Sequence, residues 1–198
     1  NPKAFFDLKE NQSKLEEIVS VVRNAFGRPD MDYEDIYAHL TSPEMLFLLE
    51  DAEKVLGMAA YNTALLSGIP SLIVEGIAIN PSIQAKGIFR EVTDLASKNK
   101  CIVCLRTQNP HMYRALQKYC SYLYPGEKKG LPLAINAIRE DLADRLKCKI
   151  NGEGVIRGYY GRLFYGEKPH HPEISQLLEE RLEMSLENGD ALLVIGVR

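Results

Sequence analysis

The sequence predicts an α/β fold, of the α+β type, built on one mixed and mostly antiparallel twisted sheet. Helical and extended patterns alternate along the chain, with no repeat of fixed period and no long linker. Extended segments at 45–50, 54–66 and 71–79 follow one another, and short turn signals join them as an antiparallel meander. A strand, a helix and a strand over 71–107 then predict a central βαβ crossover, which creates a parallel pair.

The residues before the meander predict one strand and two helices. The run AFFDL (4–8) is expected to form a short strand. Ser13 with Glu16 three positions later is a capping-box pattern, and apolar residues recur at helical spacing until Gly27 ends that helix. A second short helix is expected over 32–40.

The residues after the meander predict four further helices and three strands. QAKGIFREVTDLASKN (84–99) has a helical apolar face, and CIVCLRT (101–107) is expected to be a buried strand. Asn109 as N-cap and Pro110 at the first helical position start a helix that runs to about residue 121.

The last third of the chain continues this alternation. Pro132 opens a helix, and VIRGYYGRLFY (155–165) is expected to be a strand. A late helix is expected over 172–188, ended by Gly189, and ALLVIGV (191–197) forms a final buried strand.

Length and charge limit the classes of protein that the chain can represent. Its 198 residues suit a single domain, 1–198, with an inserted helical segment at about 131–189 before the last strand. A net charge of −3 argues against a nucleic-acid binder, because neutralising phosphates needs a basic surface. No apolar run has the length of a membrane span, and the first residues lack the apolar region of a secretion signal. We therefore expect a soluble, cytoplasmic protein without nucleic-acid or membrane partners.

The cysteines and histidines do not form a metal-ligand pattern. Cys101 and Cys104 lie three apart in an extended segment, so their side chains point to opposite faces and cannot share a metal ion. The adjacent His170 and His171 have no third ligand nearby in the sequence. The sequence favours reduced cysteines and no metal site.

The stretch VEGIAINPSIQAKGIFREV carries the strongest functional pattern. A strand leads into a loop whose end, QAKG (84–87), becomes the first turn of a helix, where backbone N–H groups and the helix dipole favour anions such as phosphates. Gly87 allows a phosphate to approach the backbone closely; the alternative is a tight turn without a ligand. Glu75 stands beside Gly76 in the apolar strand, where a carboxylate either faces a cleft or is paired with an Arg.

This stretch resembles the GCN5-related N-acetyltransferase (GNAT) family. The family's acetyl-coenzyme A motif is an apolar strand, a V/I-x-P segment and then Q/R-x-x-G-x-G/A opening a helix. The corresponding residues here are Ile77, Ala78, Ile79, Asn80 and Pro81, followed by Gln84, Ala85, Lys86, Gly87, Ile88 and Phe89. Phe89 departs from the strict pattern, which has Gly or Ala, and is compatible with the fold if it points into the core.

Asn109 matches the family's next signature, an Asn that starts the helix after the following strand. The resemblance covers about residues 4–123 in element order. It implies a GNAT-like sheet with helices on both faces and splayed parallel strands, here with extra helices near the C-terminus.

The resemblance also implies where acetyl-coenzyme A would bind. The pyrophosphate would lie on the amides of residues 84–89. The strand residues Ile77, Ala78 and Ile79 would lie along the pantetheine arm, with the Ile77 amide near the thioester carbonyl, where it would stabilise the developing oxyanion. Asn109 would touch the arm from the other side.

The resemblance implies a primary amine as acceptor, so a base must take a proton from it. We expect Glu75 to be this base, directly or through a water molecule. The family's general acid is a Tyr at a position that is Leu116 here. Tyr113 and Tyr119 lie one turn before and after it and either could act as the acid; ordinary packing of both, with solvent as proton source, is the alternative.

The sequence therefore favours an N-acetyltransferase that transfers an acetyl group from acetyl-coenzyme A to an amine of a small molecule or peptide in a ternary complex. The alternative is a non-catalytic acyl-coenzyme A sensor or interaction module of the same fold. A nucleotide-binding protein is disfavoured because neither G-x-G-x-x-G nor a P-loop is present. Five tyrosines lie in the segments where the family builds its acceptor site. We expect them to line that site, to pack at the edge of the sheet or to form a homodimer contact: Tyr33, Tyr37, Tyr159, Tyr160 and Tyr165.

Overall fold

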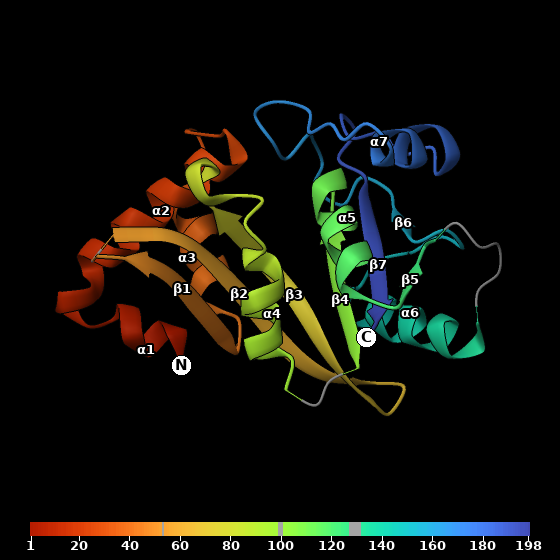
Figure 1. The fold of residues 1–198 in the computed structure, drawn as a ribbon, viewed down its shortest axis with the longest axis horizontal. Helices are drawn as coiled ribbons and strands as arrows, with labels where there is room; N and C mark the ends of the chain where they lie inside the picture. Colours follow the sequence, from red (N-terminus) through yellow and green to blue (C-terminus); the bar gives the residue numbers. More distant parts are fainter. Residues whose placement is uncertain (53, 99–100, 127–131) are drawn as a thin grey trace. The chain divides into compact units, whose positions relative to one another are not determined.

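In the computed structural model the chain forms two compact units (Figure 1). The described residues are 1–52, 54–98, 101–126 and 132–198. Unit 1 consists of residues 1–63 and 73–98, and unit 2 of residues 64–72 and 99–198. The predicted α/β class is confirmed, because helices alternate with seven strands whose pairings within the units are antiparallel. The single-domain organisation stays a prediction.

Unit 1 contains the predicted meander except for residues 64–72, the end of β2 and the start of β3, which belong to unit 2. β1 (Met45–Asp51) pairs antiparallel with β2 (Lys54–Leu66), with a bulge after Leu49. β3 (Ile69–Ile79) follows after a tight turn, and the amide of Asn80 donates to the carbonyl of Leu56 at 2.8 Å. This bond holds the end of β3 beside β2, so the order of the three extended segments is confirmed.

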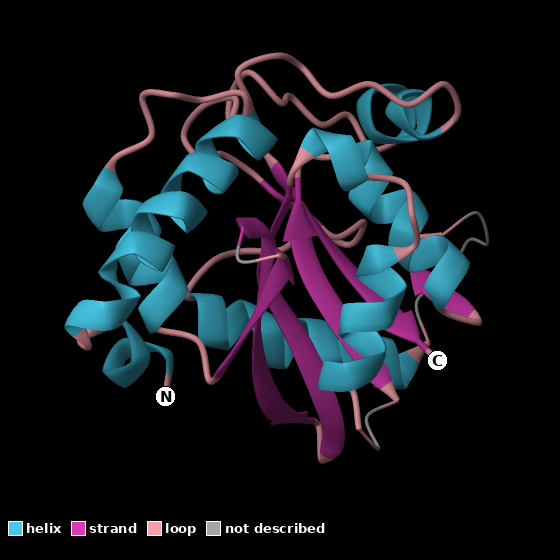
Figure 2. Cartoon of the chain, turned by 60° about the vertical axis from the view of Figure 1, so that its left-hand side comes forward, coloured by secondary structure: helices cyan, strands magenta, loops and turns pink. Residues whose placement is uncertain are grey.

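Helices cover both faces of the unit 1 strands (Figures 1 and 2). α2 (Gln12–Phe26) and α3 (Tyr33–Thr41) pack on one face, while α4 (Ile88–Ala96) lies on the other, where the hydroxyls of Tyr61 and Thr93 are 3.1 Å apart. Alternate residues of a strand point to opposite faces, so β2 contacts the helices on both faces. The core under α2 and α3 includes Leu15, Ile18, Val19, Val22, Ile36, Leu40, Met58, Ala60 and Ala78.

Two predictions for the start of the chain are wrong. Residues 4–8 are not a strand, because α1 (Pro2–Phe6) is a helix whose first turn is capped by Asn1 Oδ1, which accepts from the Lys3 amide at 2.9 Å. The capping box at Ser13 is also wrong: a 3₁₀ turn, η1 (Lys9–Asn11), precedes α2, and Ser13 lies inside the helix. The predicted end at Gly27 is confirmed, with φ +61°.

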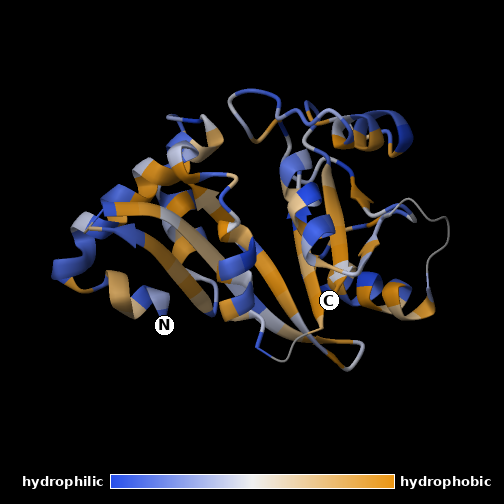
Figure 3. Ribbon diagram, viewed as in Figure 1, coloured by the Kyte–Doolittle hydropathy of each residue, from blue (hydrophilic) through white to orange (hydrophobic). Residues whose placement is uncertain are grey.

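Unit 2 is organised around its last strand. β7 (Ala191–Val197) pairs antiparallel with β4 (Ile102–Thr107) along one edge. β5 (Tyr122–Tyr124) and β6 (Val155–Ile156) pair with opposite ends of its other edge. β4 and β7 are hydrophobic along their length (Figure 3), as the sequence predicts for buried strands.

Two helices of unit 2 begin where the sequence places them. α5 (Pro110–Tyr119) starts after Asn109, whose Oδ1 accepts from the His111 amide at 2.9 Å. α6 (Leu133–Leu146) starts after Pro132 and buries an apolar face. The order of elements that the family resemblance implies is therefore confirmed from β1 through α5.

Two predictions for the last third are wrong. Only β6 is extended within 155–165, because turns with left-handed glycines follow it, and the predicted helix over 172–188 is short. α7 spans Ile174–Gln176 and continues as a wider π-type turn, η3 (Leu177–Arg181). Glu183 then takes a left-handed conformation, φ +52°, which ends the helical path.

Two glycines in the strands of unit 1 give a test of this packing. A Cβ at Gly57 would lie 2.9 Å from the carbonyl oxygen of Ala78, whereas a Cβ at Gly76 would meet nothing within 4 Å among the described residues. We expect Gly57→Ala to lower the free energy of unfolding by about 1–3 kcal/mol because β2 and β3 must move apart. Gly76→Ala, measured by the same urea titrations, should stay within about 0.5 kcal/mol of the parent. Equal effects would contradict the close approach at Gly57.

Candidate functional site

The connection from β3 to α4 in unit 1 is an exposed loop with a defined backbone path. A short 3₁₀ turn, η2 (Pro81–Ile83), begins at Asn80, whose Oδ1 accepts from the Ser82 amide at 3.0 Å. The side-chain amide of Gln84 reaches back and donates to the carbonyl of Ile79 at 2.8 Å. These two bonds fix the loop to the end of the strand.

The loop then turns into α4 through two left-handed residues. Ala85 has φ +62° and Gly87 has φ +81°, and the helix begins at Ile88. A left-handed residue followed by a helical one directs successive N–H groups to the same side, a geometry that binds anions. A Cβ at Gly87 would meet nothing within 4 Å among the described residues, so the backbone is open there.

The side chains around this turn leave the backbone accessible and add positive charge. Phe89 is 9% exposed and points into the interior. A Phe in place of the motif's Gly or Ala is therefore compatible with the fold. Lys86 and Arg90 are exposed beside the first turn of α4. Their charges have the same sign as the helix dipole at this end.

The strand residues of the predicted cofactor site differ in burial. Ala78 is 2% exposed and belongs to the core under α2 and α3, so its side chain is not available to a ligand. Ile77 and Ile79 are partly exposed. Any contact from Ala78 would therefore come from its backbone.

Glu75 is half-buried and is held by an amide. The Nδ2 of Asn62 donates to Glu75 Oε1 at 2.8 Å, and the Oδ1 of Asn62 accepts from the Glu44 amide at 2.8 Å. The sequence analysis did not identify Asn62. The signal was an amide side chain within the otherwise apolar strand VLGMAAYNTALL.

Unit 2 holds the other three predicted site residues, all on or next to α5. Asn109 uses its side-chain oxygen to cap the helix. Tyr113 is fully buried and its hydroxyl donates to the carbonyl of Pro125 at 2.7 Å, which gives it a packing role. Tyr119 is half-buried under the guanidinium of Arg198, 4.9 Å from its ring centre. Leu116, at the family's Tyr position, is fully buried.

Tyr165 is a further residue that the structure brings to Asn109. Its hydroxyl forms hydrogen bonds with the side chains of Asn109 and Thr107; these lower its pKa, but burial raises it more, to about 12. Tyr165 is therefore protonated at neutral pH. The sequence placed it only in a group of tyrosines, because residues 56 positions apart give no local signal.

That group of tyrosines is two groups, one in each unit. Tyr33 and Tyr37 stack in α3, with ring centres 6.4 Å apart. In unit 2, Tyr159, Tyr160, Phe164 and Tyr165 form a chain of ring contacts, and Arg106 donates to the Tyr159 hydroxyl at 2.6 Å.

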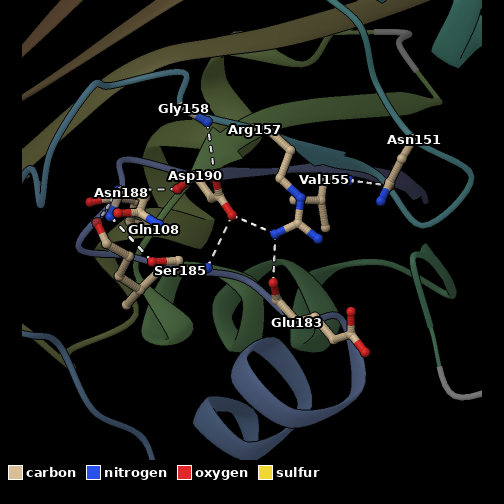
Figure 4. A network of polar contacts seen from close by, with 10 residues as sticks. Gln108, Asn151, Val155, Arg157, Gly158, Glu183, Ser185, Asn188 and Asp190 are labelled. Carbon is tan, nitrogen blue, oxygen red and sulfur yellow. Dashed lines mark hydrogen bonds and ion pairs between the residues drawn. The ribbon is translucent and has the colours of Figure 1, made fainter.

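Two buried polar side chains hold the aromatic segment 157–165 in place (Figure 4). Gln108 is 1% exposed; its Nε2 donates to the carbonyls of Asp190 and Leu186 at 3.0 and 3.1 Å, and its Oε1 accepts from the Phe164 amide at 2.8 Å. Asp190 accepts from the amides of Gly158 and Ser185 at 2.8 and 3.0 Å and from the guanidinium of Arg157 at 2.6 Å.

The cysteines are free thiols, as predicted. Burial raises the pKa of the Cys104 thiol well above its usual range. The expected burial of Cys101 is wrong, because this residue lies just before β4 begins and is exposed. Within the described ranges, no group of three or more His, Cys, Asp or Glu side chains could hold a metal ion. In the same part of the chain no helix has both the length and the apolar character of a membrane span.

Comparison with known proteins gives structural likenesses only. No family model and no curated protein matches the chain. Among solved structures it is similar to aminoglycoside 6'-acetyltransferase type Ii, with TM-score 0.47 and 11% identity over 94% of this chain and 91% of that one. It is also similar to the ribosomal-protein-S18-alanine N-acetyltransferase of Escherichia coli (TM-score 0.45, 13% identity, 93% and 88%) and to Tetrahymena GCN5 (0.44, 12%, 64% and 85%).

Asp190 allows the network in unit 2 to be tested through pH. Burial alone would raise the pKa of this carboxyl group, but donors from Ser185, Gly158 and Arg157 outweigh burial and hold it below its ordinary value of 3.8. The group therefore stabilises the fold at pH values above 3.8, and this contribution is lost as the pH falls through the lower, folded value. We expect Asp190→Asn to lower the free energy of unfolding by about 3 kcal/mol at pH 7.

The difference between Asp190→Asn and the parent, measured by urea unfolding, should shrink as the pH falls below 3.8. A difference that stays constant from pH 7 to pH 3 would contradict the role of the ionised carboxylate.

Proposed function

We propose that the chain is an N-acetyltransferase that transfers an acetyl group from acetyl-coenzyme A to a primary amine. The observation that carries the proposal is the loop 84–88, where Ala85 and Gly87 take left-handed conformations directly before α4 begins, a backbone geometry that favours anions. The same positions match the cofactor motif of the GNAT family. The backbone of the loop and the motif therefore support the same ligand.

The pyrophosphate of the cofactor is the group that this loop would bind. Its charge would be met by the amides of residues 84–89, by the positive end of the α4 dipole and by Lys86. Backbone donors need no reorganisation on binding, so they favour a bound anion with little loss of conformational entropy.

The backbone of Ile77 and Ile79 would pair with the pantetheine arm, and Ala78 contributes only main chain because its side chain lies in the core. The Ile77 amide would then donate to the thioester oxygen as negative charge develops there. Asn109 is assigned to the same arm on the family resemblance alone.

The transfer proceeds by direct attack in a ternary complex. Glu75, directly or through a water molecule, accepts a proton from the ammonium group of the acceptor, and the amine nitrogen then attacks the thioester carbon. The C–N bond forms, the C–S bond breaks, and the sulfur leaves with the electron pair. The buried hydroxyl of Tyr113 donates a hydrogen bond to the Pro125 carbonyl, so we assign the protonation of the thiolate to Tyr119 or to solvent.

The loop is tested by a pair of variants that differ only in charge. Asp and Asn both tolerate the left-handed conformation of Gly87, and the space around a Cβ there is open among the described residues. We expect Gly87→Asp to weaken coenzyme A binding at least about tenfold relative to Gly87→Asn, because the added carboxylate lies beside the pyrophosphate. Isothermal titration calorimetry measures both. Equal affinities in the two variants would place the phosphate site elsewhere.

Catalysis is tested with Glu75→Gln, which keeps the shape of the side chain and removes the base. Release of coenzyme A from acetyl-coenzyme A is measured across a panel of amines, polyamines, amino acids and peptides. We expect turnover by the parent on at least one acceptor and a fall of about 100-fold or more in Glu75→Gln, with coenzyme A affinity unchanged. Tight binding without turnover on any acceptor would instead support a non-catalytic acyl-coenzyme A module.

A further inference from the structure

A series of four hydrogen bonds leads from Thr63 through Glu44 and Asn62 to the carboxylate of Glu75. Glu44, just before β1, accepts at Oε2 from the Thr63 amide at 3.0 Å and from the Thr63 hydroxyl at 2.7 Å. The Glu44 amide in turn donates to Asn62 Oδ1, and Asn62 Nδ2 donates to Glu75 Oε1, both at 2.8 Å. The series runs from β1 through β2 to β3.

The orientation of the Asn62 amide follows from the chemistry of its two partners. The backbone N–H of Glu44 can only donate, and an ionised carboxylate can only accept. Turning the amide over would place two N–H groups face to face and two oxygens face to face. The observed orientation is therefore the one that both neighbours require.

A donor fixed in this way also fixes the carboxylate. The N–H of Asn62 on Oε1 restrains the position of the Glu75 carboxylate. Glu75 has three rotatable bonds, and each hydrogen bond to the carboxylate reduces the range of positions that its oxygens can take. A general base must lie within hydrogen-bond reach of the proton that it takes, and small displacements reduce the rate strongly.

We propose that Asn62 is a positioning residue that holds the Glu75 carboxylate in the geometry needed to accept the proton of the acceptor amine. This inference rests on the proposed function. It assigns a role to a residue that the cofactor motif does not include and that is anchored by the backbone amide of Glu44, just before β1. Asn62 is half-exposed and does not belong to the apolar core under α2 and α3.

A double-mutant cycle tests the proposal with Asn62→Leu, Glu75→Gln and the two combined. We expect Asn62→Leu to lower kcat about 10- to 100-fold, with KM for acetyl-coenzyme A within about twofold of the parent. In the Glu75→Gln background the same substitution should change kcat less than about twofold, because the positioned group is already absent. Asn62→Asp keeps the acceptor for the Glu44 amide and replaces the donor to Glu75 by a carboxylate oxygen that repels it; this second variant should also lose activity.

Thr63→Val is the matched control. It lies next to Asn62 on β2 and loses the hydroxyl bond to Glu44, but not the contact with Glu75. We expect its kcat to stay within about twofold of the parent. A loss as large as that of Asn62→Leu would show that loosening of β1 against β2 explains the effect, and would overturn the proposal.

The remaining outcomes separate this inference from the proposed function. If Glu75→Gln lowers kcat and Asn62→Leu does not, Asn62 is not a positioning residue and the proposed function stands. Equal losses from Asn62→Leu in both backgrounds would show a structural role and would also overturn the inference. If no amine is acetylated, or Glu75→Gln is fully active, the inference falls together with the assigned base.

Discussion

The turn between β3 and α4 is the constraint on which the candidate site depends. Ala78 is buried in the core on one side of the turn, and Phe89 is buried on the other, so the strand and the helix are both fixed. The backbone must reverse between them within a few residues, and it does so through left-handed conformations at Ala85 and Gly87. Apolar packing anchors both ends of the turn, and the side chains of Asn80 and Gln84 hold its first half against the end of β3.

Amide side chains have the same organising role in both units. Asn62 joins a backbone N–H to a carboxylate, and Gln108 joins three carbonyls to one N–H. An amide has a donor and an acceptor at its two ends, so it can connect chain segments that have no complementary groups of their own. Gln108 is 1% exposed, and the position of segment 157–165 depends on this side chain together with Asp190.

The sequence could predict the elements that depend on local signals, but not those that depend on distant contacts. The meander and α5 follow from local signals: alternation of apolar residues, turn residues, and the Asn109-Pro110 start. Residues 155–188 do not, because Arg157 and Gly158 bind Asp190, which is more than 30 positions away, instead of continuing a strand. Residues 2–6 form a helix in which Phe6 is buried in the core of unit 1. The residues around Phe6 in the sequence do not indicate this packing. In the candidate site, the loop was predicted from its motif, whereas Asn62 depends on register between strands.

The distribution of charge bears on how the loop would bind its anion. The acidic residues near the C-terminus are largely used within unit 2: Asp190 is buried among donors, and Lys168 binds Glu179 and Glu187 at 2.5 and 3.4 Å. The net charge of −3 is thus not concentrated at the loop, where Lys86 and Arg90 flank the start of α4. Two exposed cations are a small electrostatic contribution, since salt screens them within about 10 Å. Binding of a pyrophosphate there must depend mainly on the direction of the backbone amides, and therefore on the two left-handed residues that set it.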